Sequence, residues 1–400
     1  MKPKRVLLAA SVASMIDQFN LSNIRLLLDL GYEVHVMCNF RQGNTCSRKR
    51  ILKLLHQLRD MQVVCHPWDC PRSIRDVAGC VRAYRQMCRL LLLGSFAWVH
   101  CHSPIGGALS RIAAHRQGIP VIYTAHGFHF YKGAPLWNWL LYYPAEKLLA
   151  HWTDVLVTVN REDYRVAKHR LKAGRICHIP GVGIDGKAFE AASHKKDSRF
   201  CACYQIPQDA LVLLSVGELN AGKNHRMVLQ ALAALGRRDV CYLICGQGRL
   251  RDELWRYAKE LGIRALVRMP GYQEDMPWIY GNADIFVFPS RREGLSVSLL
   301  EAMAASLPCV VSDIRGNREL IRPVRAEDAS GVCLAPGGAR FSLDKPWQLT
   351  AALHRLLEDE ALRKRCGAYN RNRMQDYSRP AVEQRMRKIY RYVSQLGCAR

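Results

Sequence analysis

The sequence is poor in acidic side chains. Its 400 residues hold 34 Asp and Glu against 59 Lys and Arg, which gives a formal net charge of +25. Such a surplus attracts anions, whether nucleic acid, an acidic membrane or a phosphorylated substrate, and does not choose among them. Hydrophobic residues make up 49% of the chain, which excludes a disordered polyelectrolyte. The length predicts a globular protein of two or three domains.

The patterns of a structural metal site are also missing. No C-x-x-C pair occurs, and the run His100-Cys101-His102 lacks the second half of a zinc motif. The 16 cysteines are scattered over a long, core-rich chain, unlike the crowded cysteines of small secreted proteins. We therefore expect reduced thiols and no metal.

No apolar run reaches the ~18 to 20 residues that a membrane-spanning helix needs. The start, MKPKRVLLAASVASM, could be read as a signal peptide. We favour a buried first strand, because a helical pattern and a second strand follow at once. The sequence thus predicts a cytoplasmic protein, either free or peripheral at the inner face of the cell membrane.

Short apolar runs alternate with helical patterns throughout the chain, which is the signature of parallel βαβ architecture. The expected strands cover residues 5–11, 33–38, 62–68, 98–103, 120–126, 155–160, 211–217, 240–246, 266–272, 285–290 and 308–313. A glycine-rich, then polar and basic stretch near residues 184–200 reads as a hinge. We expect an α/β protein with domains at 1–190 and 191–375 and a C-terminal helix, 376–400, that packs back on the first domain.

Ligands of open parallel sheets bind beyond the carboxyl ends of the strands, so the residues that follow each strand matter most. In the first half, the stretch TAHGFHFY places His126 and His129 after such a strand. The pair could be a metal site, a catalytic device or a packed strand end, and the spacing alone does not decide. Phe128 and Phe130 read as packing residues.

In the second half, SRREGLSVSLLEAM follows a strand and holds Glu293 and Glu301 around a glycine-containing loop that runs into a helix. Backbone amides of such a loop can bind a diphosphate, and a carboxylate can accept hydrogen bonds from ribose hydroxyls. The alternative is a capping box from Ser298 to Glu301. Lys223, in GELNAGKNH, can neutralise a phosphate, although a lone loop lysine is more often a solvated surface residue.

The stretch EGLSVSLLEAM resembles the E-x7-E motif of retaining family 4 glycosyltransferases, which have the GT-B fold of two facing Rossmann-like domains with a cleft between them. The resemblance extends through GELNAGKNH, CGQGRL, SDIRGNREL, IPGVGID, CHSPIGGALSR, YTAHGFHFYKGAP and TDVLVTVNREDY, and so covers nearly the whole chain. It is strongest to the branch that acts in capsule, exopolysaccharide and O-antigen biosynthesis.

The resemblance implies the following roles. His126, Glu293 and Lys223 would be catalytic, and His129 and Asn160 would lie on the acceptor side. The donor would be bound by Gly217, Glu218, Lys223, Gly246, Gly271, Gly294, Leu295, Ser296, Val297 and Glu301. Glu301 would hold the ribose, Glu293 the donor sugar and Lys223 the diphosphate.

Two positions depart from the family pattern. Glu218 stands where many relatives have an arginine, and we expect it to orient Lys223 or a neighbour instead of binding phosphate. Ser296 stands where proline is common, which leaves the loop backbone less constrained. No D-x-D sequence occurs, so we expect metal-independent transfer without a cofactor. The resemblance implies that the transfer is retaining.

The resemblance implies a hexosyltransferase that moves a sugar from a nucleotide-diphosphate sugar, expected to be a UDP-sugar, to a glycan or lipid-diphosphate-linked acceptor. The segment 133–152 and the helical run 82–93 join aromatic or apolar residues to basic ones, which suits an anionic membrane surface. The alternative is that the aromatics fill the core and the arginines face water. An epimerase or a phosphorylase could share the fold. Nucleic-acid binding is a remote alternative, because no recognition motif is present.

Overall fold

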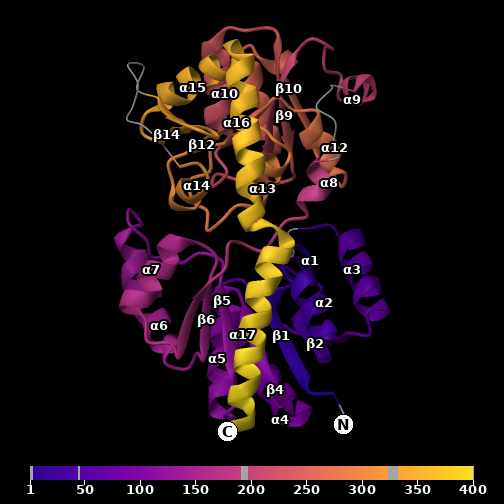
Figure 1. The fold of residues 1–400 in the computed structure, drawn as a ribbon, viewed down its shortest axis with the longest axis vertical. Helices are drawn as coiled ribbons and strands as arrows, with labels where there is room; N and C mark the ends of the chain where they lie inside the picture. Colours follow the sequence, from indigo (N-terminus) through magenta and orange to yellow (C-terminus); the bar gives the residue numbers. More distant parts are fainter. Residues whose placement is uncertain (1–2, 44–45, 191–196, 323–331, 400) are drawn as a thin grey trace. The chain divides into compact units, whose positions relative to one another are not determined.

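The computed structural model describes residues 3–43, 46–190, 197–322 and 332–399. The chain forms two compact units, one made of Met1–Val182 and Pro380–Arg400 and the other of Gly183–Arg379 (Figure 1). The hinge was expected near 184–200 and the first unit was expected to end at 190. The first unit ends earlier, because Ile184 and Phe189 are buried in the core of the second unit. Residues 191–196, which are part of the expected hinge, lie outside the described residues.

The first unit contains a seven-stranded sheet in the order β3-β2-β1-β4-β5-β6-β7, and all its strand pairs are parallel. The central strands are buried almost end to end, as expected of strands covered by helices on both faces. The strands are β1 Arg5–Val12, β2 Glu33–Asn39, β3 Val64–Pro67, β4 Phe96–His102, β5 Val121–Ala125, β6 Val155–Thr158 and β7 Arg175–His178.

Helices α4, α5 and α6 form one layer of this unit, in which α5 contacts both α4 and α6. The C-terminal helix α17 packs over β4, where Tyr390 stacks on Trp98 at 5.3 Å and contacts His100. The helices are α1 Ala13–Phe19, α2 Leu21–Asp29, α3 Arg48–Asp60, α4 Val77–Gly94, α5 Pro104–Arg116, α6 Leu136–Ala150, α7 Arg161–Arg170 and α17 Arg379–Ala399.

The second unit also has seven strands, in the order β10-β9-β8-β11-β12-β14-β13, with β13 antiparallel to β14. Successive strands are added outward in opposite directions from β8 and β11, so the topological switch lies between these two neighbours. The strands are β8 Leu211–Val216, β9 Val240–Cys245, β10 Val267–Gly271, β11 Ile285–Phe288, β12 Cys309–Ser312, β13 Cys333–Ala335 and β14 Gly338–Phe341.

Two hydrophobic clusters cover the two faces of this second sheet. Together with the parallel order, they confirm the predicted α/β class of two Rossmann-like units. The helices are α8 Gly186–Glu190, α9 Ser198–Tyr204, α10 His225–Leu235, α11 Arg251–Glu260, η1 Arg264–Leu266, α12 Met276–Gly281, α13 Val297–Ala304, α14 Arg315–Leu320, α15 Pro346–Glu358, α16 Glu360–Arg373 and η2 Met374–Tyr377.

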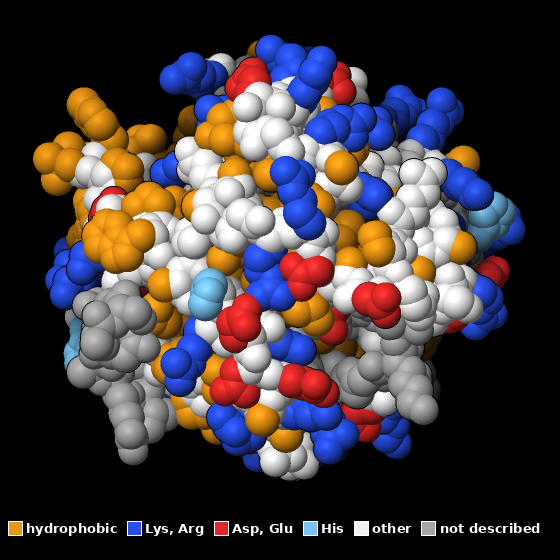
Figure 2. Space-filling view, turned by 90° about the horizontal axis from the view of Figure 1, so that it is seen from above, with side chains coloured by type: hydrophobic (Ala, Val, Ile, Leu, Met, Phe, Trp, Pro, Cys, Tyr) orange, Lys and Arg blue, Asp and Glu red, His pale blue; other side chains and the backbone are white. Residues whose placement is uncertain are grey.

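Figure 2 shows one face of the protein, on which Lys and Arg side chains are spread widely and several carboxylates gather near the centre. The basic surplus of the sequence is therefore not confined to one patch on this face. Within the described ranges, no helix is both long enough and apolar enough to cross a membrane.

Candidate active site

Lys223 and Glu293 meet at the switch point of the second sheet. Lys223 lies in the loop after β8 and Glu293 in the loop after β11, and Lys223 Nζ is 2.7 Å from Glu293 Oε1. Lys223 Nζ also lies 4.8 Å from the centre of the Phe288 ring. Both charged side chains are about one-fifth exposed, so an anionic ligand can reach the ammonium group. Lys223 is therefore a fixed cation and not the freely solvated lysine of the alternative interpretation.

The loops that follow β8, β9 and β10 are joined through their backbones. Gly217 N donates to Cys245 O, and Gly246 N donates to Gly271 O. Gly246 has a φ of +156°, and a Cβ there would lie 1.8 Å from Gly217 O, so only glycine allows this approach. Gly271 also has a positive φ, of +88°. The predicted donor-binding glycines of these three loops therefore form one continuous rim.

Glu218, predicted to orient Lys223 or a neighbour, is exposed. In the described part of the chain, the carboxylate that holds Lys223 is that of Glu293. Glu218 therefore does not supply that contact, and its orienting of a neighbour stays a prediction. The backbone amide of Lys223 is bound by the side chain of Asn220, at 3.0 Å, which shapes the loop without using Glu218.

The loop after β11 ends in α13, whose N-cap is Ser296. Ser296 Oγ accepts from Leu299 N at 3.4 Å and lies 2.9 Å from Ser298 Oγ. The capping box from Ser298 to Glu301 is thus not formed. Ser296, which stands where proline is common in the family, supplies a capping oxygen, which constrains the loop in a different way. Gly294, Leu295 and Val297 lie in the same loop and the first turn of the helix.

Glu301 points from α13 toward α12. Its Oε2 lies 3.0 Å from Tyr280 OH, and burial raises the pKa of Glu301 to about 7. Tyr280 itself is fully buried. A hydroxyl group that donates to this carboxylate would favour its charged form. Tyr280 could not be found from the sequence, because its contact with Glu301 is tertiary.

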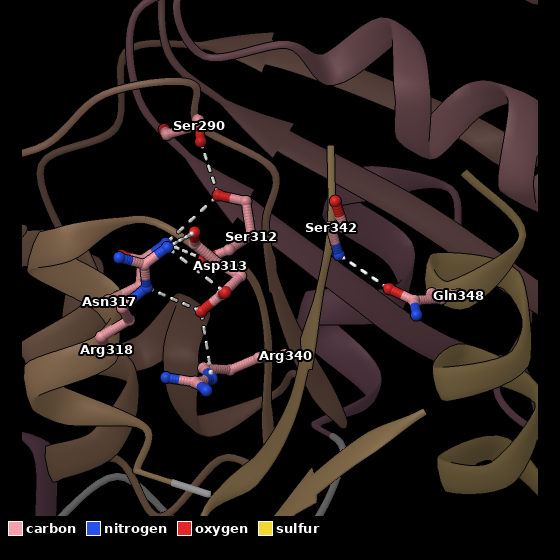
Figure 3. A network of polar contacts seen from close by, with 8 residues as sticks. All are labelled: Ser290, Ser312, Asp313, Asn317, Arg318, Arg340, Ser342 and Gln348. Atoms are coloured by element: carbon pink, nitrogen blue, oxygen red, sulfur yellow. Dashed lines mark hydrogen bonds and ion pairs between the residues drawn. The ribbon is translucent and has the colours of Figure 1, made fainter. Parts of the chain in front are cut away.

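The loop after β12 braces the loop that carries Glu293. Arg315 Nε donates to Glu293 O at 3.2 Å, and a Cβ on Gly316 would lie 2.6 Å from Gly294 O. Figure 3 shows a polar network that includes the start of the loop after β12, in which Ser312 Oγ donates to Ser290 O and the Asn317 side chain donates to Ser312 O. Ser312, Arg315, Gly316 and Asn317 belong to the stretch SDIRGNREL, and no role was predicted for them from the sequence.

In the first unit, His126 follows β5 and joins a buried row of imidazoles. His126 Nε2 lies 3.1 Å from His102 Nδ1, and the rings of His102 and His100 are 4.3 Å apart. Burial lowers the pKa of His126 to about 4 and that of His100 to about 3. These imidazoles are therefore neutral at pH 7.

The contacts of His102 determine the tautomer of His126. His102 Nε2 is buried and has no hydrogen-bond partner within the described ranges. Buried donors without a partner are rarer than under-satisfied acceptors, so the proton belongs on Nδ1 of His102. His102 then donates to His126 Nε2, and His126 carries its own proton on Nδ1. His126 is thereby prepared to donate a hydrogen bond from Nδ1.

The other predicted residues of the first unit have local contacts. The His129 ring lies 4.6 Å from the Tyr142 ring, and Asn160 caps α7 by accepting from Asp163 N at 2.8 Å. Asn160 is 1% exposed, so its side chain is committed to the cap. Phe128 and Phe130 are buried and stacked, which confirms their packing role. No group of three or more His, Cys, Asp or Glu suited to a metal ion occurs among the residues that the structure covers.

Comparisons with known proteins cover both units. Residues 21–185 match the model described as Glycosyltransferase Family 4, and residues 202–373 match Glycosyl transferases group 1. EpsD of Bacillus subtilis (strain 168), which is assigned as a glycosyltransferase, is 35% identical over 80% of this chain and 81% of its own length.

One further curated protein and one solved structure are similar to this chain. The UDP-Gal:alpha-D-GlcNAc-diphosphoundecaprenol alpha-1,3-galactosyltransferase of Escherichia coli is 30% identical over 62% of this chain and 65% of its own length. Anabaena Alr3699/HepE, solved in complex with UDP-glucose, superposes with a TM-score of 0.76 at 15% identity, over 97% of this chain and 99% of that one. The two units therefore have the GT-B architecture, and the chain belongs to the family 4 glycosyltransferases.

Proposed function

We propose that the protein transfers a sugar from a UDP-sugar to a lipid-diphosphate-linked glycan acceptor in surface polysaccharide biosynthesis, such as that of capsule or O-antigen, with retention of anomeric configuration. The observation that carries this proposal is the contact between Lys223 and Glu293 at the switch point, bordered by the glycine loops. This is where an open parallel sheet binds its ligand. The relative from Escherichia coli supports the choice of a lipid-diphosphate acceptor, and the UDP-glucose complex of HepE supports the donor.

The proposed mechanism is electrostatic. The departing UDP gains negative charge, and Lys223 and the free amides at the start of α13 stabilise that charge. Arg315 holds the Glu293 loop through its backbone carbonyl, so Glu293 can contact the sugar while it positions Lys223. The ammonium group supplies a cation at the leaving diphosphate, and we propose that no metal ion is needed.

Retention would follow from attack by the acceptor hydroxyl on the face that the diphosphate leaves. The hydroxyl oxygen forms the new bond to the anomeric carbon, the bond to the phosphate oxygen breaks, and the hydroxyl proton passes to that phosphate. Glu301 would bind the ribose hydroxyls, and His126 would donate from Nδ1 to the sugar or its phosphates. His129 is proposed to lie on the acceptor side, whereas the buried cap at Asn160 would act only by shaping the start of α7.

A panel of nucleotide sugars tests this function. The purified protein is incubated with each sugar, with and without a polyprenyl-diphosphate-linked glycan, and released nucleotide and glycan product are measured. We expect UDP release that depends on the acceptor. An epimer formed without acceptor, or a sugar phosphate formed with inorganic phosphate, would instead show an epimerase or a phosphorylase.

We also propose that the enzyme works in the cytoplasm at an anionic membrane surface, where a lipid-linked acceptor would be located. The net charge of +25 supports this, because each basic residue near an anionic surface contributes about 1 kcal/mol.

A further inference from the structure

Helix α6 carries a row of exposed apolar side chains. Leu136, Trp137, Leu140 and Leu141 are 73%, 79%, 58% and 55% exposed. Their spacing along the chain places them on one side of the helix. Ten of the sixteen large hydrophobic side chains that are exposed in the described residues lie on α6 or α4. Exposed apolar side chains gathered in this way mark an interaction surface.

The opposite side of α6 is firmly packed. Trp139 and Tyr143 lie against Phe130, with ring centres 5.6 and 5.3 Å apart. Arg111, which is fully buried, binds both carboxylate oxygens of Glu146, at 2.6 and 3.1 Å. The aromatic residues of this segment thus divide between core and surface, and the core does not need the exposed row.

The charges around the row select an anionic partner. Glu146 is the only acidic residue of α6, and Arg111 neutralises it. Lys132 and Lys147, which flank the row in the sequence, are exposed. An apolar row between cations and without a free carboxylate is complementary to the interface of an anionic bilayer.

Helix α4, in the same layer, adds a second basic feature. It contains no Asp or Glu, and Arg82, Arg85 and Arg89 are exposed at helical spacing. The three arginines line a hollow of 550 Å³ together with Val81 and neighbouring side chains. Guanidinium groups arranged in this way suit the phosphates of lipid headgroups.

We propose that α6 inserts Leu136, Trp137, Leu140 and Leu141 into the interface of an anionic phospholipid bilayer, while the arginines of α4 bind lipid phosphates. Trp137 is suited to this depth, because indole rings prefer the headgroup region. Insertion would hold the protein at the surface through apolar contacts as well as through charge. The inference deepens the membrane association proposed above, on which it rests, and does not depend on the identity of the donor.

Vesicle flotation of the full chain tests the proposal. The vesicles are phosphatidylcholine alone, or phosphatidylcholine and phosphatidylglycerol in equal parts. The wild type should float with the anionic vesicles and keep part of its binding in high salt, because apolar insertion is not screened. The double variant Leu140→Glu/Leu141→Glu should bind about 100-fold more weakly. Trp347→Glu is the matched control, since Trp347 is 57% exposed on α15 of the other unit, and it should bind like the wild type.

Three outcomes would overturn the proposal. Undiminished flotation of the α6 variant would show that α6 does not insert, and equal binding of the triple variant Arg82→Gln/Arg85→Gln/Arg89→Gln would remove the role of α4. A concentration-dependent dimer of the wild type that the α6 variant abolishes, without vesicle binding, would assign the row to a second copy of the chain. Transfer to a short water-soluble acceptor should survive the α6 substitutions, so failure of insertion and failure of the proposed enzyme activity are distinguishable.

Discussion

Loss of the Lys223 ammonium group should slow sugar transfer strongly. A unit charge about 4 Å from the leaving phosphate contributes about 4 kcal/mol at an effective dielectric constant of about 20. Loss of one such stabilising group typically lowers the rate about 10²- to 10³-fold. We therefore expect Lys223→Ala to lower kcat about 10²- to 10³-fold, measured as acceptor-dependent UDP release at saturating donor.

Two further variants sharpen this test. Arg226→Ala is the control, because Arg226 lies three residues further on, in the first turn of α10, and its guanidinium group lies over Tyr257, 3.5 Å from the ring centre. It should keep near-normal kcat. The double variant Lys223→Ala/Glu293→Gln should lose about another tenfold, because Glu293 is proposed to contact the sugar as well as the lysine. A kcat of Lys223→Ala within threefold of the wild type would refute the electrostatic mechanism.

Three other predictions follow from the site. Donor binding should strengthen as the pH rises through about 7, because ribose hydroxyls favour the charged form of Glu301, and below that pH binding should release a proton. Calorimetry in buffers of different ionisation enthalpy measures the proton release, which Glu301→Gln should abolish. His102→Ala should lower kcat about tenfold and change the tautomer of His126 as seen in ¹⁵N NMR spectra. His102→Asn, which keeps a donor near the position of Nδ1, should restore both the rate and the tautomer. An unchanged tautomer in His102→Ala would contradict the assignment. Gly246→Ala should lower Tm by several degrees, because the added Cβ would clash with Gly217 O. Gly186→Ala should leave Tm unchanged, because the space around Gly186 is open. Equal Tm values of the two variants would contradict the close packing of the glycine loops.

The sequence predicted those parts of the fold that depend on local pattern. Continuous apolar runs such as residues 211–216 become buried parallel strands, and the residues after them carry the candidate site. It missed β7, β13 and β14. The sequences of β7 and β14, RICH and GARF, mix charged and apolar residues, and β13 is only three residues long. All three are recognisable only through the strands with which they pair.

The candidate site was predictable in its positions and not in its contacts. Loop chemistry identified Lys223 and Glu293 separately, but their ion pair joins residues 70 apart in the sequence. The sequence around Tyr280 and Arg315 does not identify them as site residues, because their contacts with Glu301 and with the Glu293 backbone form only in the folded protein. The expectation that Glu218 could orient Lys223 rested on nearness in the chain, whereas the carboxylate that contacts Lys223 is that of the distant Glu293.

The anomeric configuration of the product tests the central claim most directly. The protein is incubated with an α-linked UDP-sugar, selected by the panel, and a polyprenyl-diphosphate-linked glycan, and the new linkage is assigned from the coupling constant of its anomeric proton by NMR. The account predicts acceptor-dependent release of UDP and an α-linked product. A β-linked product, or release of UDP that is the same with and without acceptor, would contradict it.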